Sequence, residues 1–173
     1  VLDRHLDATR FLGSAMAGLL SIIALYQLSI FFRRRDQQES LWFGLLCGVF
    51  AVRQVVTTRL PEFFIDAPTA LGFIWRDRLE YATMICAVMA GMAFFRTLMV
   101  SRVMDHATRI AWCLSLLYLG TVLVTEPTFF ASKVRLYHLV LLGSLLVALV
   151  EMVRSLWDGN RSVGISLLGL LPL

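Results

Sequence analysis

Arg53 is the residue of this sequence whose type and position most clearly suggest a chemical role. It interrupts an apolar block at residues 41–60, about twelve residues from the start of the block, where an α-helix would place it ~18 Å from that end. An arginine so deep in an apolar layer is energetically costly and normally faces protein or a water-filled cavity. We therefore predict a polar site around Arg53, to which Thr57 belongs because it lies one turn outward on the same face. The candidate partners at similar depth are Thr121 and, slightly higher, Glu80. The alternative is that Arg53 extends to the nearer surface of the layer, beside Arg59.

The same block carries a stripe of small residues formed by Gly44, Gly48 and Ala51. Small residues at this spacing allow the backbone of a neighbouring helix to approach closely. Nine residues separate Gly44 from Arg53, and at ~100° per residue the two lie on opposite faces of a helix. If the glycine face packs against one helix, Arg53 requires a second helix or a cavity on its other side.

A second group of charges lies near the end of the apolar block at residues 136–153. Glu151 is followed three residues later by Arg154, and Arg96 stands at the matching level of the block at residues 79–100. Opposite charges near the end of a block are more typical of a structural ion pair than of a proton relay. We therefore predict a structural role for these three residues.

The sequence contains none of the common catalytic or cofactor-binding patterns. It has no HExxH motif and no paired histidines placed to hold haem between helices. The segment GISLLG at Gly164–Gly169 lacks the glycine spacing of a nucleophile elbow, and no P-loop or dinucleotide-binding glycine pattern is present. We therefore expect no metal, no cofactor and no catalysis in this segment, without excluding an enzyme elsewhere in the full-length protein.

The elements that must position these residues follow from the composition. Apolar residues make up 58% of the chain and charged residues 16%, and the mean hydropathy is +0.75. Soluble domains contain roughly 25% charged residues. Phe11–Phe32 carries no formal charge over 22 residues, which at ~1.5 Å per residue covers the ~30 Å hydrocarbon layer. The chain is therefore predicted to be an integral membrane protein whose first partner is the lipid bilayer.

Short charged joints divide the chain into six apolar blocks. They predict an all-α, polytopic helix bundle with up-down connectivity, containing five complete spans and the start of a sixth: residues 11–32, 41–60, 79–100, 110–125, 136–153 and 163–173. Residues 1–10 are interpreted as a connector from an upstream segment. The longest joint, residues 61–75, contains two prolines and several aromatic residues, which favours a re-entrant or interface-lying stretch.

Arginine and lysine are unequally distributed between the two sides of the predicted bundle. One side receives eight of them, including the cluster Arg33, Arg34 and Arg35, whereas the other receives five. Because basic residues accumulate in cytoplasmic loops, the cluster is predicted to face the cytoplasm and the amino terminus to be extracytoplasmic. This placement accounts for the net charge of +4 without nucleic acid as a partner.

Three stretches together resemble a known family. They are GLLSIIALYQLSIFFRRRDQQESLWFGLLCGVFAVR (18–53), WRDRLEYATMICAVMAGMAFFRTLM (75–99) and DGNRSVG (158–164). Their long first span, short basic loop, Leu-Glu-Tyr entry and small basic turn are similar to the membrane region of the bacterial seven-transmembrane receptors with diverse intracellular signalling modules. One departure is Gln27, because the family often has asparagine after the tyrosine that here is Tyr26.

The resemblance implies a function for the segment. It implies seven spans in the full-length protein, an extracytoplasmic sensory domain before Val1, and a cytoplasmic output such as a histidine kinase, a nucleotide or dinucleotide cyclase, or a phosphatase. We accordingly predict a signal-transducing domain of the bacterial inner membrane. Its expected partners are a second copy in a homodimer and the sensor and effector domains of the same chain. Two alternatives stay open: a small carrier that uses Arg53 to hold an anionic substrate, and a non-catalytic membrane subunit.

Overall fold

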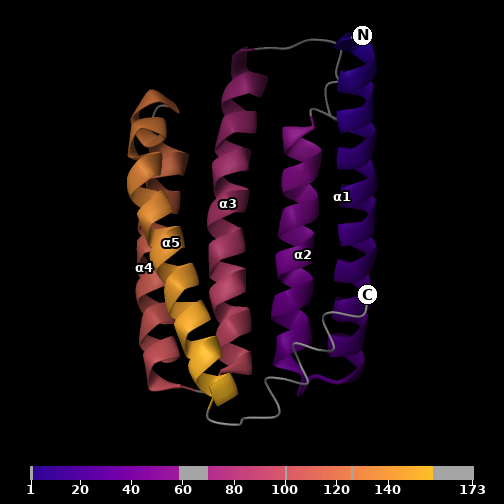
Figure 1. Ribbon diagram of the computed structural model, residues 1–173. Coiled ribbons are helices and arrows are strands. Elements are labelled where there is room, and N and C mark those ends of the chain that lie inside the picture. Colours follow the sequence, from indigo (N-terminus) through magenta and orange to yellow (C-terminus); the bar gives the residue numbers. More distant parts are fainter. Residues whose placement is uncertain (1, 59–69, 100, 126, 158–173) are drawn as a thin grey trace.

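The computed structural model describes residues 2–58, 70–99, 101–125 and 127–157 (Figure 1). These residues form five α-helices and contain no strand. The helices are α1 (Leu2–Arg33), α2 (Gln38–Thr57), α3 (Ala70–Leu98), α4 (Arg102–Val124) and α5 (Pro127–Trp157). The predicted all-α bundle is therefore confirmed.

Each of the five helices contains a stretch that is long and apolar enough to cross a membrane. These stretches are Phe11–Arg33, Gln38–Thr57, Ile74–Leu98, Arg102–Val124 and Ser132–Ser155. Large apolar side chains cover the outside of the bundle; Leu117, for example, is 72% exposed and Val124 is 83% exposed. A surface of this kind is stable where lipid tails surround it.

Several helices extend beyond the uncharged blocks from which they were predicted. α4 begins at Arg102 and not near residue 110, and α5 begins at Pro127 and not near residue 136. Residues 70–75, predicted as part of a re-entrant or interface-lying stretch, instead form the first turns of α3. The helices continue because charged side chains near a membrane surface reach the headgroups without ending the helix.

Two other predicted segments are affected by these boundaries. Residues 2–10, interpreted as a connector, continue α1 without a break. The predicted sixth span, residues 163–173, lies outside the described residues, as do residues 61–69 of the longest joint.

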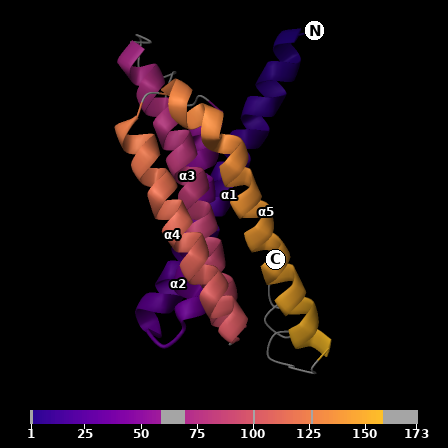
Figure 2. The same ribbon diagram turned by 90° about the vertical axis from the view of Figure 1, so that its left-hand side faces the viewer.

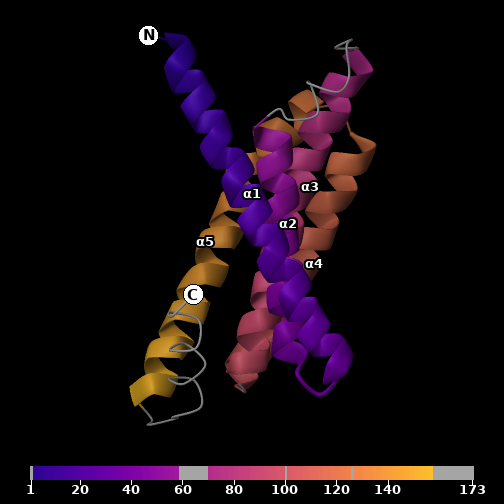
Figure 3. The same cartoon turned by 90° about the vertical axis from the view of Figure 1, so that its right-hand side faces the viewer.

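α3 lies at the centre of the bundle, with α2 and α1 on one side and α4 and α5 on the other (Figure 1). Each helix contacts the next along the chain, and α5 also contacts α3. Of the membrane-crossing stretch of α3, 39% is buried, against 11% for α1. The amino-terminal half of α1 and the carboxyl-terminal half of α5 diverge from the other helices (Figures 2 and 3).

A cluster of buried apolar side chains joins α3, α4 and α5. Ile85, Met104 and Val122 are fully buried there. The rings of Tyr118 and Tyr137 stack with their centroids 4.7 Å apart, which fixes α4 against α5. We call the end of the bundle that carries Arg33–Arg35 the cluster end, and the other the opposite end.

Candidate functional site

α2 uses two opposite faces to contact two different helices. Its small-residue face lies against α1, because a Cβ atom added to Gly44 would lie 3.2 Å from the backbone carbonyl oxygen of Ala24. A Cβ atom added to Gly48 would lie 3.9 Å from the Ala24 Cβ atom. Ala51 continues this face and is buried. The missing side chain at Gly44 therefore allows the backbones of α1 and α2 to approach closely.

The other face of α2 carries Arg53, which reaches α3. Its Nη1 atom donates a hydrogen bond of 3.3 Å to the backbone carbonyl oxygen of Glu80. Its Nη2 atom lies 3.9 Å from the Oε1 atom of the Glu80 carboxylate, and the two side chains are 31% and 38% exposed. Arg53 lies one turn before α2 ends at Thr57, so this polar pair joins α2 to α3 near the opposite end.

Thr57 and Thr121, the other two residues predicted at this site, bond to their own helices. The Thr57 hydroxyl donates to the backbone carbonyl of Arg53 at 2.9 Å, and the Thr121 hydroxyl donates to that of Tyr118 at 2.7 Å. Threonine hydroxyls inside helices commonly bond in this way. Thr121 is on α4, which α3 separates from α2 (Figure 1). Of Glu80, Thr57 and Thr121, all of which are described, only Glu80 contacts the guanidinium group.

A groove of about 450 Å³ extends from Arg53 between α2, α3 and α5. Its lining is mostly apolar, and among the described residues Arg53 is the one formal charge in it. His138 and Ser144 also line the groove. The Nδ1 atom of His138 lies 2.8 Å from the Val134 carbonyl oxygen, and the Ser144 hydroxyl donates to the Val140 carbonyl. The groove therefore combines one cation with an apolar wall.

Arg78 forms a second contact between helices that the sequence did not single out. Its Nη1 and Nη2 atoms donate to the backbone carbonyl oxygens of Leu123 and Thr125 at 3.0 and 3.2 Å. These carbonyl groups lie at the carboxyl end of α4, where the helix dipole favours a cation. The sequence signal for this contact is an arginine near the start of a helix that runs antiparallel to α4, but Arg76 fits this description as well as Arg78 does. The sequence alone could not distinguish the two.

A family comparison agrees with this architecture. The model of the family described as 7TM diverse intracellular signalling matches residues 9–173. The chain belongs to this family. No curated protein and no solved structure matches the chain. The match to the family model confirms the resemblance found in residues 18–53 and 75–99. The protein is a multi-pass membrane protein of a signalling family.

At the cluster end, the described residues of this member of the 7TM diverse intracellular signalling family form two ion pairs. Glu151 is buried, and its Oε1 atom lies 3.9 Å from Nη1 of Arg154, one turn further along α5. Arg96, predicted at the same level, instead donates from Nε to the carboxylate of Asp105 at 2.5 Å. Asp105 lies in the first turn of α4, directly across the short joint from Arg96. The predicted grouping of Arg96 with Glu151 is therefore replaced by a contact between α3 and α4.

The arginine cluster of this 7TM diverse intracellular signalling protein lies at the joint between α1 and α2. Arg33 ends α1, and the Gln37 amide donates to the Arg34 carbonyl at 3.1 Å within the following turn. Arg33, Arg34 and Arg35 are all exposed. The described residues include no group of three or more histidine, cysteine or acidic side chains that could hold a metal ion.

Proposed function

We propose that this chain is the signal-transmitting membrane domain of a receptor in the bacterial inner membrane. It couples an extracytoplasmic sensing module, preceding Val1, to a cytoplasmic output module. The support comes from membership of a membrane signalling family and from the asymmetry of the basic residues, which favours a cytoplasmic cluster end. The observation that carries the proposal is the contact between Arg53 and Glu80.

This contact matters because α3 is tied to its neighbours at both membrane surfaces. At the opposite end, Arg53 ties α3 to α2 and Arg78 ties it to α4. At the cluster end, Arg96 pairs with Asp105 of α4. A displacement of one end of α3 therefore has a direct mechanical route to the other end.

In this mechanism, binding outside selects between two packings of the helices. A ligand shifts the balance only by its difference in affinity for the two states. Small sliding or rotation of packed helices is an established form of such a change. α3 is the moving element, and the α1–α2 contact at Gly44 serves as its fixed reference. The catalytic step belongs to the output module, and a homodimer brings two output modules together.

The test is the signalling output of the full-length protein in its native membrane. Arg53→Ala removes both contacts to Glu80, so the response to stimulation is expected to fall at unchanged expression. Arg135→Ala is the matched control, because Arg135 is an exposed arginine of α5. An unchanged response in Arg53→Ala would remove Arg53 from the mechanism.

The groove beside Arg53 favours one other function, a carrier for a small anion. This function requires the guanidinium group to exchange Glu80 for the substrate, whereas the observed pairing already compensates its charge. Proteoliposomes distinguish the two functions. Uptake of an anion that is lost in Arg53→Ala and retained in Arg135→Ala would support a carrier.

A further inference from the structure

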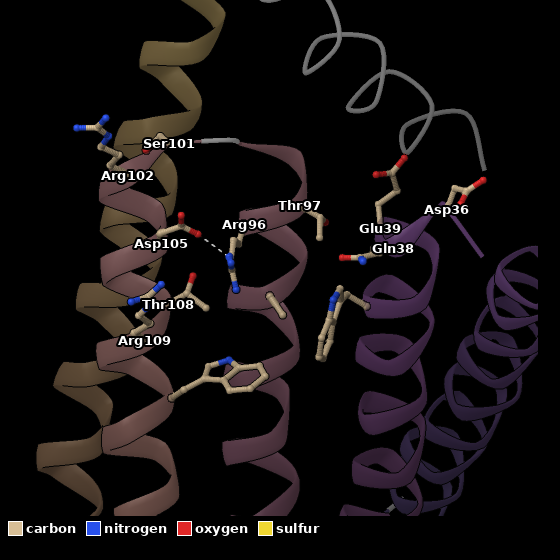
Figure 4. A pocket seen from close by; sticks show the side chains of 13 residues that line it. Asp36, Gln38, Glu39, Arg96, Thr97, Ser101, Arg102, Asp105, Thr108 and Arg109 are labelled. Carbon is tan, nitrogen blue, oxygen red and sulfur yellow. Dashed lines mark hydrogen bonds and ion pairs between the residues drawn. The ribbon is translucent and has the colours of Figure 1, made fainter. Parts of the chain in front are cut away.

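A polar cavity lies away from Arg53, at the cluster end. It has a volume of about 640 Å³ and is formed by α2, α3, α4 and the turn before α2 (Figure 4). Ser101 and Thr97 lie at the joint between α3 and α4 and line its rim. Because α3 ends at Leu98 and α4 begins at Arg102, the cavity lies at the level of the lipid headgroups.

Opposite net charges line opposite sides of this cavity. α3 and α4 supply Arg96, Arg102 and Arg109 together with Asp105, which pairs with Arg96, whereas Asp36 and Glu39 come from the turn and the first residues of α2 (Figure 4). Within the described part of the chain, Arg109 and Glu39 form no ion pair with another residue. The cavity therefore presents a positive wall, whose three arginines outnumber Asp105, and a negative wall. The two walls do not neutralise each other by direct contact.

Two tryptophans lie between the charged walls and deeper in the bundle. The rings of Trp42 and Trp112 meet edge to face, with their centroids 5.9 Å apart. The indole Nε1 atom of Trp112 donates to the Met89 carbonyl at 3.1 Å, which fixes its ring against α3. Tryptophan prefers the boundary between headgroups and acyl chains. These rings therefore form an apolar floor at the depth of a lipid's glycerol backbone.

We propose that this cavity binds the headgroup of a zwitterionic phospholipid that carries a primary ammonium group, phosphatidylethanolamine. The phosphate lies against the guanidinium group of Arg109 and against the Nη groups of Arg96, whose Nε is already bonded to Asp105. Both arginines donate charge-assisted hydrogen bonds to it. The ammonium group lies against Asp36 and Glu39, and the glycerol backbone lies over Trp42 and Trp112. The lipid thereby bridges α2 and α4 across α3.

The arrangement of charges selects among the common headgroups. Phosphatidylglycerol offers a phosphate but no cation, so Asp36 and Glu39 remain unpaired beside it. Phosphatidylcholine offers a cation, but its trimethylammonium group has no N–H to donate to a carboxylate. A primary ammonium group has three such donors. Phosphatidylethanolamine is therefore the headgroup that satisfies both walls.

Native mass spectrometry of the purified full-length protein with an equimolar mixture of the three phospholipids tests the proposal. We expect phosphatidylethanolamine to be retained about tenfold more than either of the others, the effect of one or two charge-assisted hydrogen bonds. Arg109→Gln is expected to reduce retention of all three lipids. The double variant Asp36→Asn/Glu39→Gln is expected to abolish the preference over phosphatidylglycerol while leaving phosphate binding intact.

Arg34→Gln is the matched control for Arg109→Gln. Arg34 is exposed in the turn between α1 and α2, at the same end of the bundle, but it does not line the cavity. It removes the same charge and should leave lipid retention unchanged. Equal retention of the three lipids, or equal losses in Arg109→Gln and Arg34→Gln, would overturn the proposal. Free phosphoethanolamine at the same concentration should not displace the lipid, and displacement would overturn its assignment as a lipid site. Thermal unfolding of each variant confirms that the folded protein is being compared.

Discussion

Arg53 holds Glu80 by two different groups, the backbone carbonyl at 3.3 Å and the side-chain carboxylate at 3.9 Å. The shorter contact does not depend on the identity of residue 80, because every residue has that carbonyl group. The link between α2 and α3 therefore depends more on the arginine than on the glutamate. This asymmetry can be measured.

Arg53→Ala should destabilise the protein more than Glu80→Gln. The arginine variant loses both contacts, for an expected decrease of about 1 kcal/mol in the free energy of unfolding. Glu80→Gln keeps the carbonyl contact and loses only a partly exposed ion pair, for less than about 0.5 kcal/mol. Reversible unfolding in mixed micelles measures both changes. A larger effect of Glu80→Gln would show that the carboxylate, not the carbonyl, holds the helices together.

The sequence placed Glu80 among the candidate partners of Arg53, because depth in a span is readable from chain position. It also placed Arg53 opposite the small-residue stripe, because helical periodicity defines faces. It could not exclude Thr121, since the rotation of α4 about its axis and its separation from α2 depend on tertiary packing. Asp105 was overlooked as the partner of Arg96 because the apolar block was taken to begin at residue 110, after it.

The contact between α1 and α2 should be sensitive to substitution at Gly44 and insensitive at Gly48. A Cβ atom at residue 44 would lie 3.1 Å from Cγ of Leu28 and 3.2 Å from the Ala24 carbonyl oxygen, so α1 must shift. We expect Gly44→Ala to lower the free energy of unfolding by about 1–2 kcal/mol. Gly48→Ala makes an ordinary contact and gains helix propensity. It should therefore lower the free energy of unfolding by less than about 0.5 kcal/mol, or raise it.

Unfolding of the two alanine variants in the same micelles measures this difference. Gly120→Ala is a further control, because nothing lies within 4 Å of the added atom. Equal destabilisation at residues 44 and 48 would mean that helix propensity or lipid exposure, and not the close approach of α1, decides the result.

The buried hydrogen bond between Ser115 and Tyr137 should respond unequally to removal of its two partners. Their hydroxyl oxygens lie 3.0 Å apart between α4 and α5, and both residues are buried. In Tyr137→Phe, the serine hydroxyl can turn to the carbonyl of Ala111 one turn earlier, so the expected cost is below about 0.5 kcal/mol. Ser115→Ala leaves the phenol group without this partner and should cost about 1–2 kcal/mol.

A double-mutant cycle checks this inequality. The double variant Ser115→Ala/Tyr137→Phe lacks both hydroxyl groups, so neither is left buried without its partner. Its stability should therefore resemble that of Tyr137→Phe. Additive losses in the double variant would indicate that packing, and not the unpaired phenol, accounts for the cost of Ser115→Ala.

The arginine cluster should lie in the cytoplasm, and cysteine labelling can establish this directly. Gln37→Cys adds a thiol beside the cluster, and Ser132→Cys adds one at the opposite end, where the crossing stretch of α5 begins. Both are introduced with Cys113→Ser, which removes the exposed native thiol. A charged maleimide added to intact spheroplasts should label residue 132, and should label residue 37 only after lysis. The physical reason is that each arginine moved through the bilayer centre costs at least about 2.5 kcal/mol, so three adjacent arginines stay on the side where synthesis places them. Labelling of residue 37 in intact spheroplasts would reverse the topology and, with it, the direction of the proposed signal.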